Sequence, residues 1–457
     1  MCGIFGAYSP MGKKVLEDVY LGLYALQHRG QEAAGVAWVN SQGRISSIKG
    51  AGLVHLALNQ AELAAVETSC AIGHVRYSTA GGSELANAQP LTASTSKTSL
   101  AVAHNGNLTN AGGIKLFLEN RGAIFHSATD TEVILHLMAH QPHKESLDAL
   151  LDSLTRLRGA YSLAMVVGQD LVAARDPWGF RPLVIGQRDD VFYVSSETCA
   201  LNLVGASVVQ EVEPGEVVIF GRKGMDSIPI PLEVKRRYGC AFEFVYFARP
   251  DSVISGRSVY EVRKELGREL ADRAPCPEAH LATGMPDSGT IAALGYAEKS
   301  ATPYEQTVVR NRYVGRTFIE PTQRVRELGV RIKLNPITEV LSGKNVVVVD
   351  DSIVRGTTCQ RMISMIKACG ATQVHVRISS PPVRFPCYYG IDTPSRVELA
   401  AARMNLRQLE REVGADSLAY ITEEDLIEAI GLPCGEVCTA CFSGQYMEGG
   451  EDHEPEL

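Results

Sequence analysis

The chain has 457 residues, with 44 basic and 52 acidic side chains that give a formal net charge of −8 at pH 7. Its length exceeds that of a typical single core and predicts two domains, and its acidic balance gives no reason to expect a nucleic-acid or membrane partner. No apolar run approaches the ~18 residues of a membrane span. Its eleven cysteines are too few for a disulfide scaffold, and without a secretory signal we expect a reducing, cytoplasmic compartment.

The first half of the chain predicts short strands separated by two helices. Three stretches alternate apolar and polar residues and are predicted as strands: 43–50, 99–106 and 190–196. Apolar residues at helical spacing predict helices over 15–30 and 129–141. Thr129 or Asp130 is placed to cap the second helix.

From Val259 onward, helices alternate with apolar strands. The predicted helices are 259–273 and 360–370, and the predicted strands lie within 280–289, 345–351 and 373–380. Such alternation predicts an α/β domain with a parallel sheet. The change of pattern near 230–240 suggests two domains, 2–233 and 234–447, followed by an acidic tail, 448–457, that we expect to be disordered.

The chain opens MCGIFGAY, and Cys2 is a candidate nucleophile. Removal of Met1 would leave one residue with both a thiol and an α-amino group. That amine has an ordinary pKa near 8, so it can accept the thiol proton at neutral pH. The alternatives are a small core residue, a lipid attachment site or no function. No signal-peptide pattern or polybasic stretch supports the lipid.

Helper residues for an amide-cleaving thiol stand in four turn-rich stretches of the first half. Asn105 and Gly106 can supply an amide and a backbone N–H to an oxyanion. Arg76 can bind the carboxylate of an amino-acid substrate, and Asp130 can bind its ammonium group. Singly, these residues also fit a hairpin turn, a surface charge and a helix cap. Together with an amino-terminal Cys-Gly, they indicate a glutamine-hydrolysing site.

These stretches resemble the class II, or N-terminal nucleophile, glutamine amidotransferases. The matching motifs are MCGIFGAY, LQHRGQEAAGVA, GHVRYSTAG, HNGNLTN, SATDTEV and RDPWGFRPLVIG. The resemblance covers nearly all of 2–230 and implies an αββα sandwich whose ammonia passes to a second site. It implies a nucleophile, Cys2, with its own amine as base, an oxyanion hole, Asn105 and Gly106, and glutamine-binding or pocket residues, Arg76, Asp130, Tyr77 and Ser78.

The most informative stretch of the second half is NVVVVDDSIVRGTT, residues 345–358. Four valines predict a buried strand, and ligands bind beyond the carboxyl ends of parallel strands. The backbone N–H groups of 355–358 can hold a phosphate at a helix start. The adjacent Asp350 and Asp351 suit a ribose diol or a magnesium ion. The alternative is an ordinary loop with capping residues.

This loop resembles the signature of type I phosphoribosyltransferases. With NRYVGRTFIEPTQ and MPDSG, the resemblance narrows to amidophosphoribosyltransferases, which use ammonia from glutamine to displace pyrophosphate from phosphoribosyl pyrophosphate and so begin purine synthesis. It implies phosphoribosyl-pyrophosphate binding by Asp350, Asp351, Ser352, Arg355, Gly356, Thr357, Thr358 and Lys333, and one magnesium ion near Ser288, Asp350 and Asp351. The basic stretch 316–336, alternatively a solvated loop, would be a lid that joins the two sites through an ammonia channel.

Four cysteines, Cys240, Cys387, Cys438 and Cys441, stand in GCAFE, FPCYYG and CTAC. Four thiolates can hold zinc or an iron–sulfur cluster, and their spacing alone does not choose. A C-x-x-C pair is also compatible with a thioredoxin-like motif. The resemblance implies a structural, oxygen-sensitive [4Fe–4S] cluster, as in one branch of the family, with Cys434 as a spare.

Two other interpretations account for only one half of the chain. Other enzymes with the same glutaminase, such as glucosamine-6-phosphate synthase or asparagine synthetase, would lack DDSIVRGTT. A phosphoribosyltransferase-like regulator of transcription would not need Cys2 and its helpers. The family resemblance further implies purine nucleotides as feedback inhibitors and a homotetramer.

Overall fold

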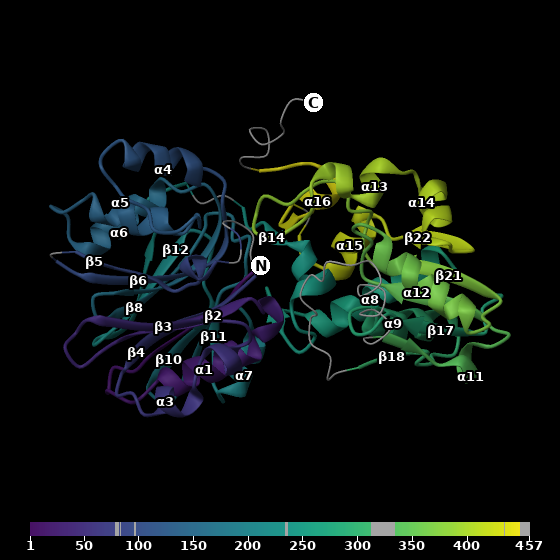
Figure 1. The fold of residues 1–457 in the computed structure, drawn as a ribbon, viewed down its shortest axis with the longest axis horizontal. Coiled ribbons are helices and arrows are strands. Elements are labelled where there is room, and N and C mark those ends of the chain that lie inside the picture. Colours follow the sequence, from purple (N-terminus) through teal and green to yellow (C-terminus); the bar gives the residue numbers. More distant parts are fainter. Residues whose placement is uncertain are drawn as a thin grey trace.

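The two halves of the chain lie side by side in this computed structural model, each with its own sheets and helices (Figure 1). The structure describes residues 1–77, 82, 84–95, 97–233, 236–311, 334–433 and 435–447. The acidic tail and three residues singled out above, Ser78, Lys333 and Cys434, lie outside the described residues, as does most of the basic stretch that was interpreted as a lid.

The first half contains two antiparallel sheets that pack face to face. One sheet has the order β11 (Ser207–Glu211), β9 (Val184–Arg188), β10 (Val191–Ser195), β1 (Gly3–Tyr8), β4 (Cys70–Arg76), β2 (Ala33–Val39) and β3 (Ile45–Ala51). The other has the order β13 (Gly224–Pro229), β12 (Glu216–Gly221), β8 (Asp170–Arg175), β7 (Gly159–Val167), β6 (Ser99–Leu108) and β5 (Leu91–Ser94). Buried apolar side chains such as Ile4, Ala101 and Val218 fill the space between them, as expected for strands with one face on a core.

Helices cover the outer faces of both sheets and complete the expected αββα sandwich. α1 (Leu16–Ala25) and α7 (Thr198–Leu203) pack on the sheet that contains β1. Three helices pack on the sheet that contains β6: α4 (Ala111–Glu119), α5 (Glu132–Ala139) and α6 (Ser146–Thr155). Two short helices, α2 (Val54–Ala57) and α3 (Gln60–Ala64), contact α1.

The three predicted strands are confirmed as β3, β6 and β10. The helix predicted over 15–30 ends at Ala25 and is followed by a 3-10 helix, Gln27–Arg29. The predicted cap of the other helix is wrong. The N-cap residue of α5 is Thr131, whose side chain makes no capping hydrogen bond. The Asp130 carboxylate does not cap the helix but accepts a hydrogen bond from the Leu108 N–H of β6.

The second half is built around a four-stranded parallel sheet, as predicted. Its order is β17 (Leu281–Gly284), β20 (Asn345–Asp350), β21 (Gln373–Ile378) and β22 (Ser417–Tyr420). α8 (Val259–Arg273), α9 (Thr290–Ser300) and α15 (Glu423–Ile430) contribute to the core on one face. α12 (Thr357–Ala368) and α14 (Leu406–Val413) contribute to the core on the other. α12 begins three residues before the predicted start, directly after a glycine, Gly356, at φ +84°.

Short elements complete the second half and connect its ends. β14 (Gly239–Cys240) pairs in parallel with β23 (Val437–Cys438), so the beginning of this half meets the end of the described chain. The remaining short elements are β15 (Val253–Ile254), β16 (Arg257–Ser258), β18 (Val308–Arg310), β19 (Leu334–Pro336), α11 (Thr338–Leu341), α13 (Ala400–Arg403) and α16 (Ala440–Ser443).

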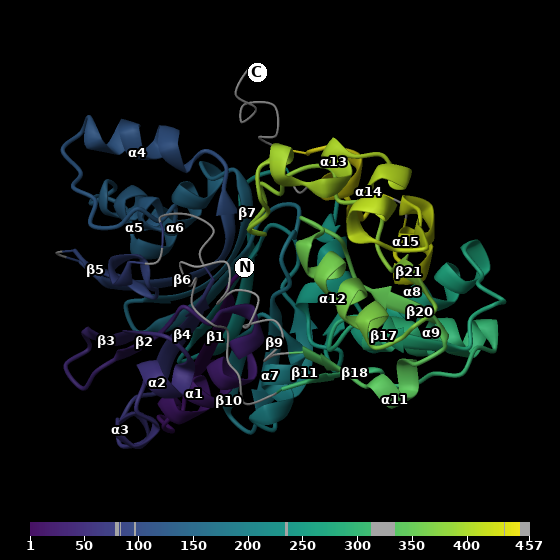
Figure 2. The same cartoon turned by 45° about the vertical axis from the view of Figure 1, so that its right-hand side comes forward.

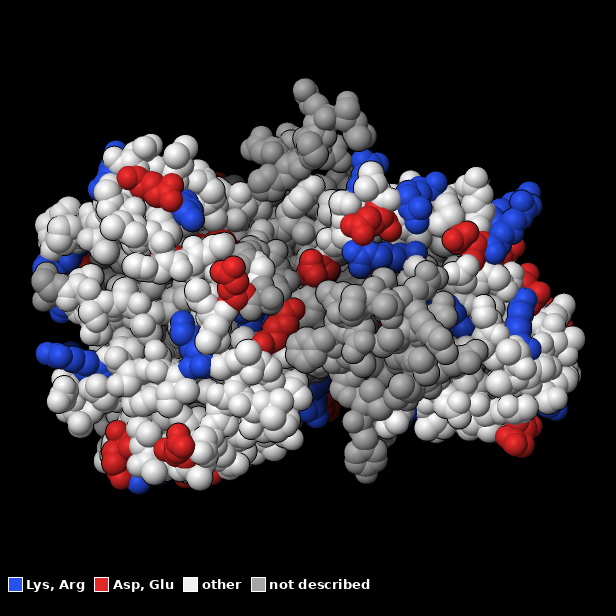
Figure 3. All heavy atoms as spheres, viewed as in Figure 1, with Lys and Arg blue, Asp and Glu red and all other residues white. Residues whose placement is uncertain are grey.

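Charged side chains of both signs are interspersed over both halves on the face seen in Figure 3. None of the helices in the described part of the chain combines the length and apolar character needed to cross a membrane.

Candidate active sites

Cys2 lies directly before β1, and the amino terminus of the chain lies between the two halves in both views (Figures 1 and 2). The residue is 8 % exposed. Its Sγ lies 3.6 Å from the carbonyl oxygen of Tyr77, and its carbonyl oxygen accepts a hydrogen bond from Arg29 Nε at 3.0 Å. The thiol is therefore held at the boundary between the halves by groups that follow α1 and β4.

Asn105 and Gly106 lie side by side in β6, next to Cys2. Asn105 is fully buried, and its Oδ1 accepts a hydrogen bond from the Cys2 backbone nitrogen at 3.3 Å. Its buried Nδ2 has no hydrogen-bond partner among the described residues. A buried donor without a partner is costly, so Nδ2 is available for an oxyanion. Gly106 has φ +155°, and a Cβ there would lie 2.0 Å from the Ala160 carbonyl oxygen, so only glycine fits.

The two candidate glutamine-binding charges frame the same site. Arg76 is the last residue of β4 and is 4 % exposed. The residue before it, Val75, pairs with Gly3, which follows Cys2 in the chain. The Asp130 carboxylate accepts a hydrogen bond from the Leu108 N–H at 2.8 Å, so it lies at the end of the strand that carries Asn105. The fold thus brings a cation and an anion to the thiol from opposite sheets.

A buried network of charges lies behind Cys2 and joins the two halves. Arg29 has no exposed side-chain surface and pairs with Glu197 and with Glu243, the latter from the second half. Burial opposes ionisation of Glu197, but the charges of His28 and Arg29 hold its pKa below its usual range. Arg181 contacts Glu243 and donates hydrogen bonds to the Tyr389 carbonyl oxygen.

The loop between β20 and α12 forms the other candidate site. The N-cap residue of α12 is Gly356, which has no side chain that could cap the helix. The backbone N–H groups at this helix start can therefore bind an anion such as phosphate. Ser352 Oγ donates to Asp351 Oδ2 at 2.6 Å, and Arg355 at the rim contacts Glu398. Thr357 and Thr358 begin the helix and line the pocket.

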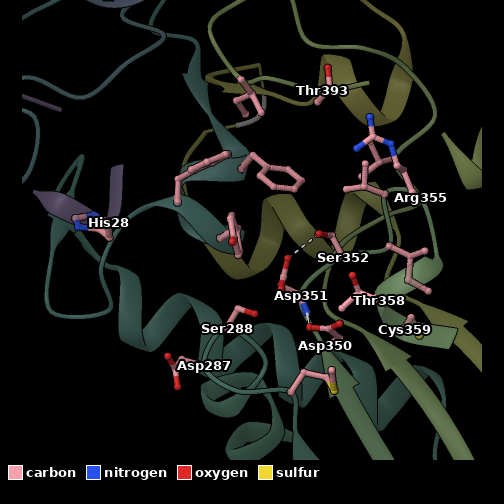
Figure 4. A pocket seen from close by; sticks show the side chains of 18 of the residues that line it. His28, Asp287, Ser288, Asp350, Asp351, Ser352, Arg355, Thr358, Cys359 and Thr393 are labelled. Atoms are coloured by element: carbon pink, nitrogen blue, oxygen red, sulfur yellow. Dashed lines mark hydrogen bonds between the residues drawn. The ribbon is translucent and has the colours of Figure 1, made fainter. Parts of the chain in front are cut away.

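Two carboxylates and a hydroxyl stand together at the carboxyl ends of β17 and β20. Figure 4 shows Ser288, Asp350 and Asp351 grouped on one side of the pocket, with His28 at its far end. Desolvation and the neighbouring Asp351 raise the pKa of Asp350 well above its ordinary value. A divalent cation would relieve this repulsion, and carboxylate and hydroxyl oxygens are ligands that magnesium accepts. These residues therefore fit a magnesium ion.

One cavity of about 750 Å³ is lined by residues of both halves. The first half contributes His28, Arg29 and Tyr77, and two of these contact Cys2. The second half contributes the 350–358 loop and residues 285–288. The sequence predicted a connection between the two sites through the basic stretch 316–336, most of which lies outside the described residues; among the described residues, the lining of this cavity connects the neighbours of the thiol with the phosphate loop.

The four cysteines interpreted as cluster ligands meet beside this cavity. Cys240 and Cys438 face each other in the β14–β23 pair, and Cys441 follows in α16. Burial, and then the Cys240 thiol, raise the pKa of Cys438 and Cys441. The Cys387 sulfur accepts a hydrogen bond from the Tyr389 N–H at 3.4 Å. The charges of these four thiols act on one another, and four neighbouring cysteines, one of them with a backbone N–H bond to its sulfur, fit a metal centre.

Comparison with known proteins decides the family. A glutamine amidotransferase domain model matches residues 74–202. The amidophosphoribosyltransferase of Bacillus subtilis (strain 168) is 46% identical over 451 residues, which is 97% of this chain and 94% of the relative. That of Mycobacterium tuberculosis (strain H37Rv) is also 46% identical, over 97% of this chain and 86% of its own. The chain belongs to the amidophosphoribosyltransferase family.

Two solved structures agree with this assignment. The glutamine phosphoribosylpyrophosphate amidotransferase of B. subtilis complexed with ADP and GMP matches with a TM-score of 0.91, at 45% identity, over 98% of this chain and 97% of that one. A structure described as the allosteric regulatory enzyme of purine biosynthesis also has a TM-score of 0.91, at 46% identity, over 98% and 96% of the two chains. The amidophosphoribosyltransferase fold thus extends over both halves.

Several site residues of this amidophosphoribosyltransferase could not be found from its sequence. The sequence around Glu197 and Glu243 is typical of an ordinary strand or helix end. Only the fold shows that these two residues pair with Arg29. Arg181 stood in a quoted motif, RDPWGFRPLVIG, without a role. A charged residue predicted at a buried position would have been the only indication, because such residues are almost always paired.

Proposed function

We propose that the chain hydrolyses glutamine at Cys2 and transfers the ammonia to phosphoribosyl pyrophosphate. Pyrophosphate leaves and 5-phosphoribosylamine forms, which is the first committed step of purine biosynthesis. Family membership supports this reaction. The observation that carries it is the single cavity that runs from the contacts of Cys2 to the 350–358 loop. An amidotransferase needs such a connection to keep ammonia from bulk water.

The glutaminase step assigns a role to each residue around Cys2. The thiolate attacks the amide carbon of glutamine, and the resulting oxyanion accepts hydrogen bonds from Asn105 Nδ2 and the Gly106 N–H. Ammonia leaves, and water then cleaves the thioester to give glutamate. While Met1 is present, the Cys2 nitrogen is an amide, so its role as general base requires removal of Met1. Arg76 and Asp130 hold the two charged groups of glutamine, with Tyr77 and Ser78 as further pocket residues.

The acceptor step uses the loop after β20. The backbone N–H groups and hydroxyls of 355–358 hold the 5′-phosphate, while Asp350, Asp351 and Ser352 face the ribose and the leaving group. Magnesium, when bound near Ser288 and the two aspartates, would neutralise charge on the departing pyrophosphate. Ammonia from Cys2 then reaches C1 of the ribose through the shared cavity. The pyrophosphate contact assigned to Lys333 lies outside the described residues and stays a prediction.

We further propose that Cys240, Cys387, Cys438 and Cys441 hold a [4Fe–4S] cluster. A tetrahedral zinc site would bring its sulfurs about 3.8 Å apart. One other group of ligand atoms among the described residues lies within 4.8 Å of one another, but no three of these four sulfurs do. A cluster binds each sulfur to a different iron and so suits a wider arrangement. Structural zinc is the alternative. The cluster would supply cross-links between segments far apart in the chain.

The same proposal extends to the two domains, the inhibitors, the oligomeric state and the location of the protein. Residues 2–233 would be the ammonia-releasing unit and residues 234–447 the acceptor unit. The relative complexed with ADP and GMP supports purine nucleotides as feedback inhibitors. A homotetramer and a cytoplasmic location agree with the family, and light scattering on the purified enzyme tests the homotetramer.

Cys2→Ala tests the proposed function. We expect glutamine-dependent formation of 5-phosphoribosylamine to be abolished, because the nucleophile is lost, while the reaction with concentrated ammonium salt continues at the wild-type rate. Pyrophosphate release measures both reactions. Cys369→Ser, which changes a half-buried cysteine far from the site, is the control and should retain both. Loss of the ammonia-dependent rate in folded Cys2→Ala enzyme would contradict the two-site mechanism.

A further inference from the structure

Three metal-ligating side chains meet at the edge of the parallel sheet opposite the phosphate loop. Cys276 and Glu278 lie in the loop between α8 and β17, and His375 lies near the start of β21. One ligand atom from each residue lies within 4.8 Å of the others. The His375 Nε2 to Glu278 Oε1 distance is 3.8 Å. Within the described part of the chain, this is the only group of three or more His, Cys, Asp or Glu residues with that arrangement.

His375 has an unused ring nitrogen that points toward the other two residues. The side chain is 5 % exposed, and its buried Nε2 has no hydrogen-bond partner among the described residues. The other nitrogen, Nδ1, lies 2.9 Å from Ser417 Oγ. Metal-bound histidines use such a bond to fix the ring and present the second nitrogen to the ion. With Nδ1–H donating to Ser417, Nε2 carries a lone pair.

Cys276 is a buried member of the same group. It is 3 % exposed, and its sulfur lies within 4.8 Å of the ligand atoms of Glu278 and His375. The nearby Arg377 donates hydrogen bonds to the Ala274 and Val376 carbonyl oxygens and to Ser417 Oγ. Its guanidinium is thus held by neighbouring acceptors, and its charge also acts on Cys276 and Glu278.

We propose that Cys276, Glu278 and His375 bind a zinc ion that is separate from both active sites and from the four-cysteine centre. A thiolate, a carboxylate and a neutral imidazole together suit zinc, which takes sulfur, oxygen and nitrogen ligands tetrahedrally. The two anionic ligands balance the charge of the ion. Because the Glu278 side chain is half exposed, the fourth position faces solvent and would hold water. The ion would tie the loop before β17 to β21.

Metal analysis of the anaerobically purified enzyme tests the site. After removal of loosely bound metal, we expect titration with zinc against a chromophoric chelator to give about one zinc per chain, with the iron content unchanged. Cys276→Ser and His375→Gln should lose this zinc. Cys369→Ser, in the same half but outside the group, should keep it. Glu278→Gln changes an exposed side chain that the fold does not need, and it should bind zinc more weakly while unfolding at the wild-type temperature.

Two measurements separate this site from the alternatives. X-ray absorption at the zinc edge should show one sulfur at about 2.3 Å and nitrogen or oxygen ligands at about 2.0 to 2.1 Å. Ser417→Ala should weaken zinc binding by about tenfold or more, because the imidazole loses its support. A four-sulfur zinc environment, equal zinc in wild type and Cys276→Ser, or no zinc bound at micromolar concentration would overturn the proposal.

Discussion

Buried charged side chains connect Cys2 with the second half of the chain. Arg29 donates to the Cys2 carbonyl oxygen and pairs with Glu197 and Glu243, and all three side chains are almost fully buried. Removal of one member of such a network leaves an uncompensated buried charge, which costs about 3–5 kcal/mol. The position of Cys2 therefore depends on Glu243, a residue of the other half. No local pattern in the sequence marks this dependence.

Asp176 provides a pH test of these buried charges. Desolvation raises its pKa to about 6, against the charge of Arg175 and three backbone hydrogen bonds. Because the folded-state pKa is raised, the contribution of Asp176 to the stability of the wild type is fully present below the unfolded pKa and is lost as the pH rises through about 6. Asp176→Asn cannot ionise and should lack this fall, whatever its absolute stability.

The test compares the free energy of unfolding at pH 5 with that at pH 7.5, for the wild type and for Asp176→Asn. Relative to Asp176→Asn, the wild type should lose roughly 1 kcal/mol over this interval, since the folded carboxyl is still mostly protonated at pH 5. Glu265→Gln, which changes an exposed carboxylate, should follow the wild type. A difference between wild type and Asp176→Asn that stays constant with pH would show that Asp176 is ionised throughout.

At the scale of elements, the segment 387–390 packs against β6, the strand that carries Asn105 and Gly106. The Asn107 side chain donates to the Tyr388 carbonyl oxygen at 3.0 Å. A Cβ on Gly390 would lie 2.7 Å from the Gly106 carbonyl carbon. Since Cys387 begins this segment, the proposed cluster would hold in place the segment that packs against β6.

Gly390→Ala tests this contact. The added methyl group should displace Gly106, and a small misplacement of a catalytic group can cost about 10²-fold in rate. We expect the glutamine-dependent rate to fall by about that factor and the ammonia-dependent rate to change little. Gly343→Ala is the matched control: it also has positive φ, but its Cβ would meet open space. Equal loss in both variants would assign the effect to backbone strain alone.

The elements also show what the sequence can predict. The run of valines in the predicted strand 345–351 is typical of a buried parallel strand, and β20 spans 345–350. The end of α1 at Ala25 was missed, because the apolar spacing continues into a 3-10 helix that carries His28 and Arg29 to the site. The position of Asn105 and Gly106 beside Cys2 was predictable from a motif. The contact of Gly390 with Gly106 was not, because it joins residues 284 positions apart, between halves.

Across the whole molecule, the four cysteines join the start, the middle and the end of the second half. A centre bound only in the folded state stabilises that state directly. Cys438→Ser should therefore lose most of its iron and colour, and limited proteolysis should cut first in the 380–447 region, where local unfolding begins. Gel bands identified by mass spectrometry report the cut sites. Initial cleavage within the first half would contradict this order, and Cys369→Ser should resemble the wild type.

The central claim is that ammonia passes from Cys2 to the phosphate loop inside one cavity. Glutamine labelled with nitrogen-15 in its amide, mixed with an excess of unlabelled ammonium salt, tests this claim when the isotope content of 5-phosphoribosylamine is measured after trapping. If ammonia moves within the cavity, nearly all of the product made at saturating glutamine should carry nitrogen-15. Dilution of the label to the composition of the bulk ammonia pool would mean that ammonia leaves the protein between the two sites and would contradict the account.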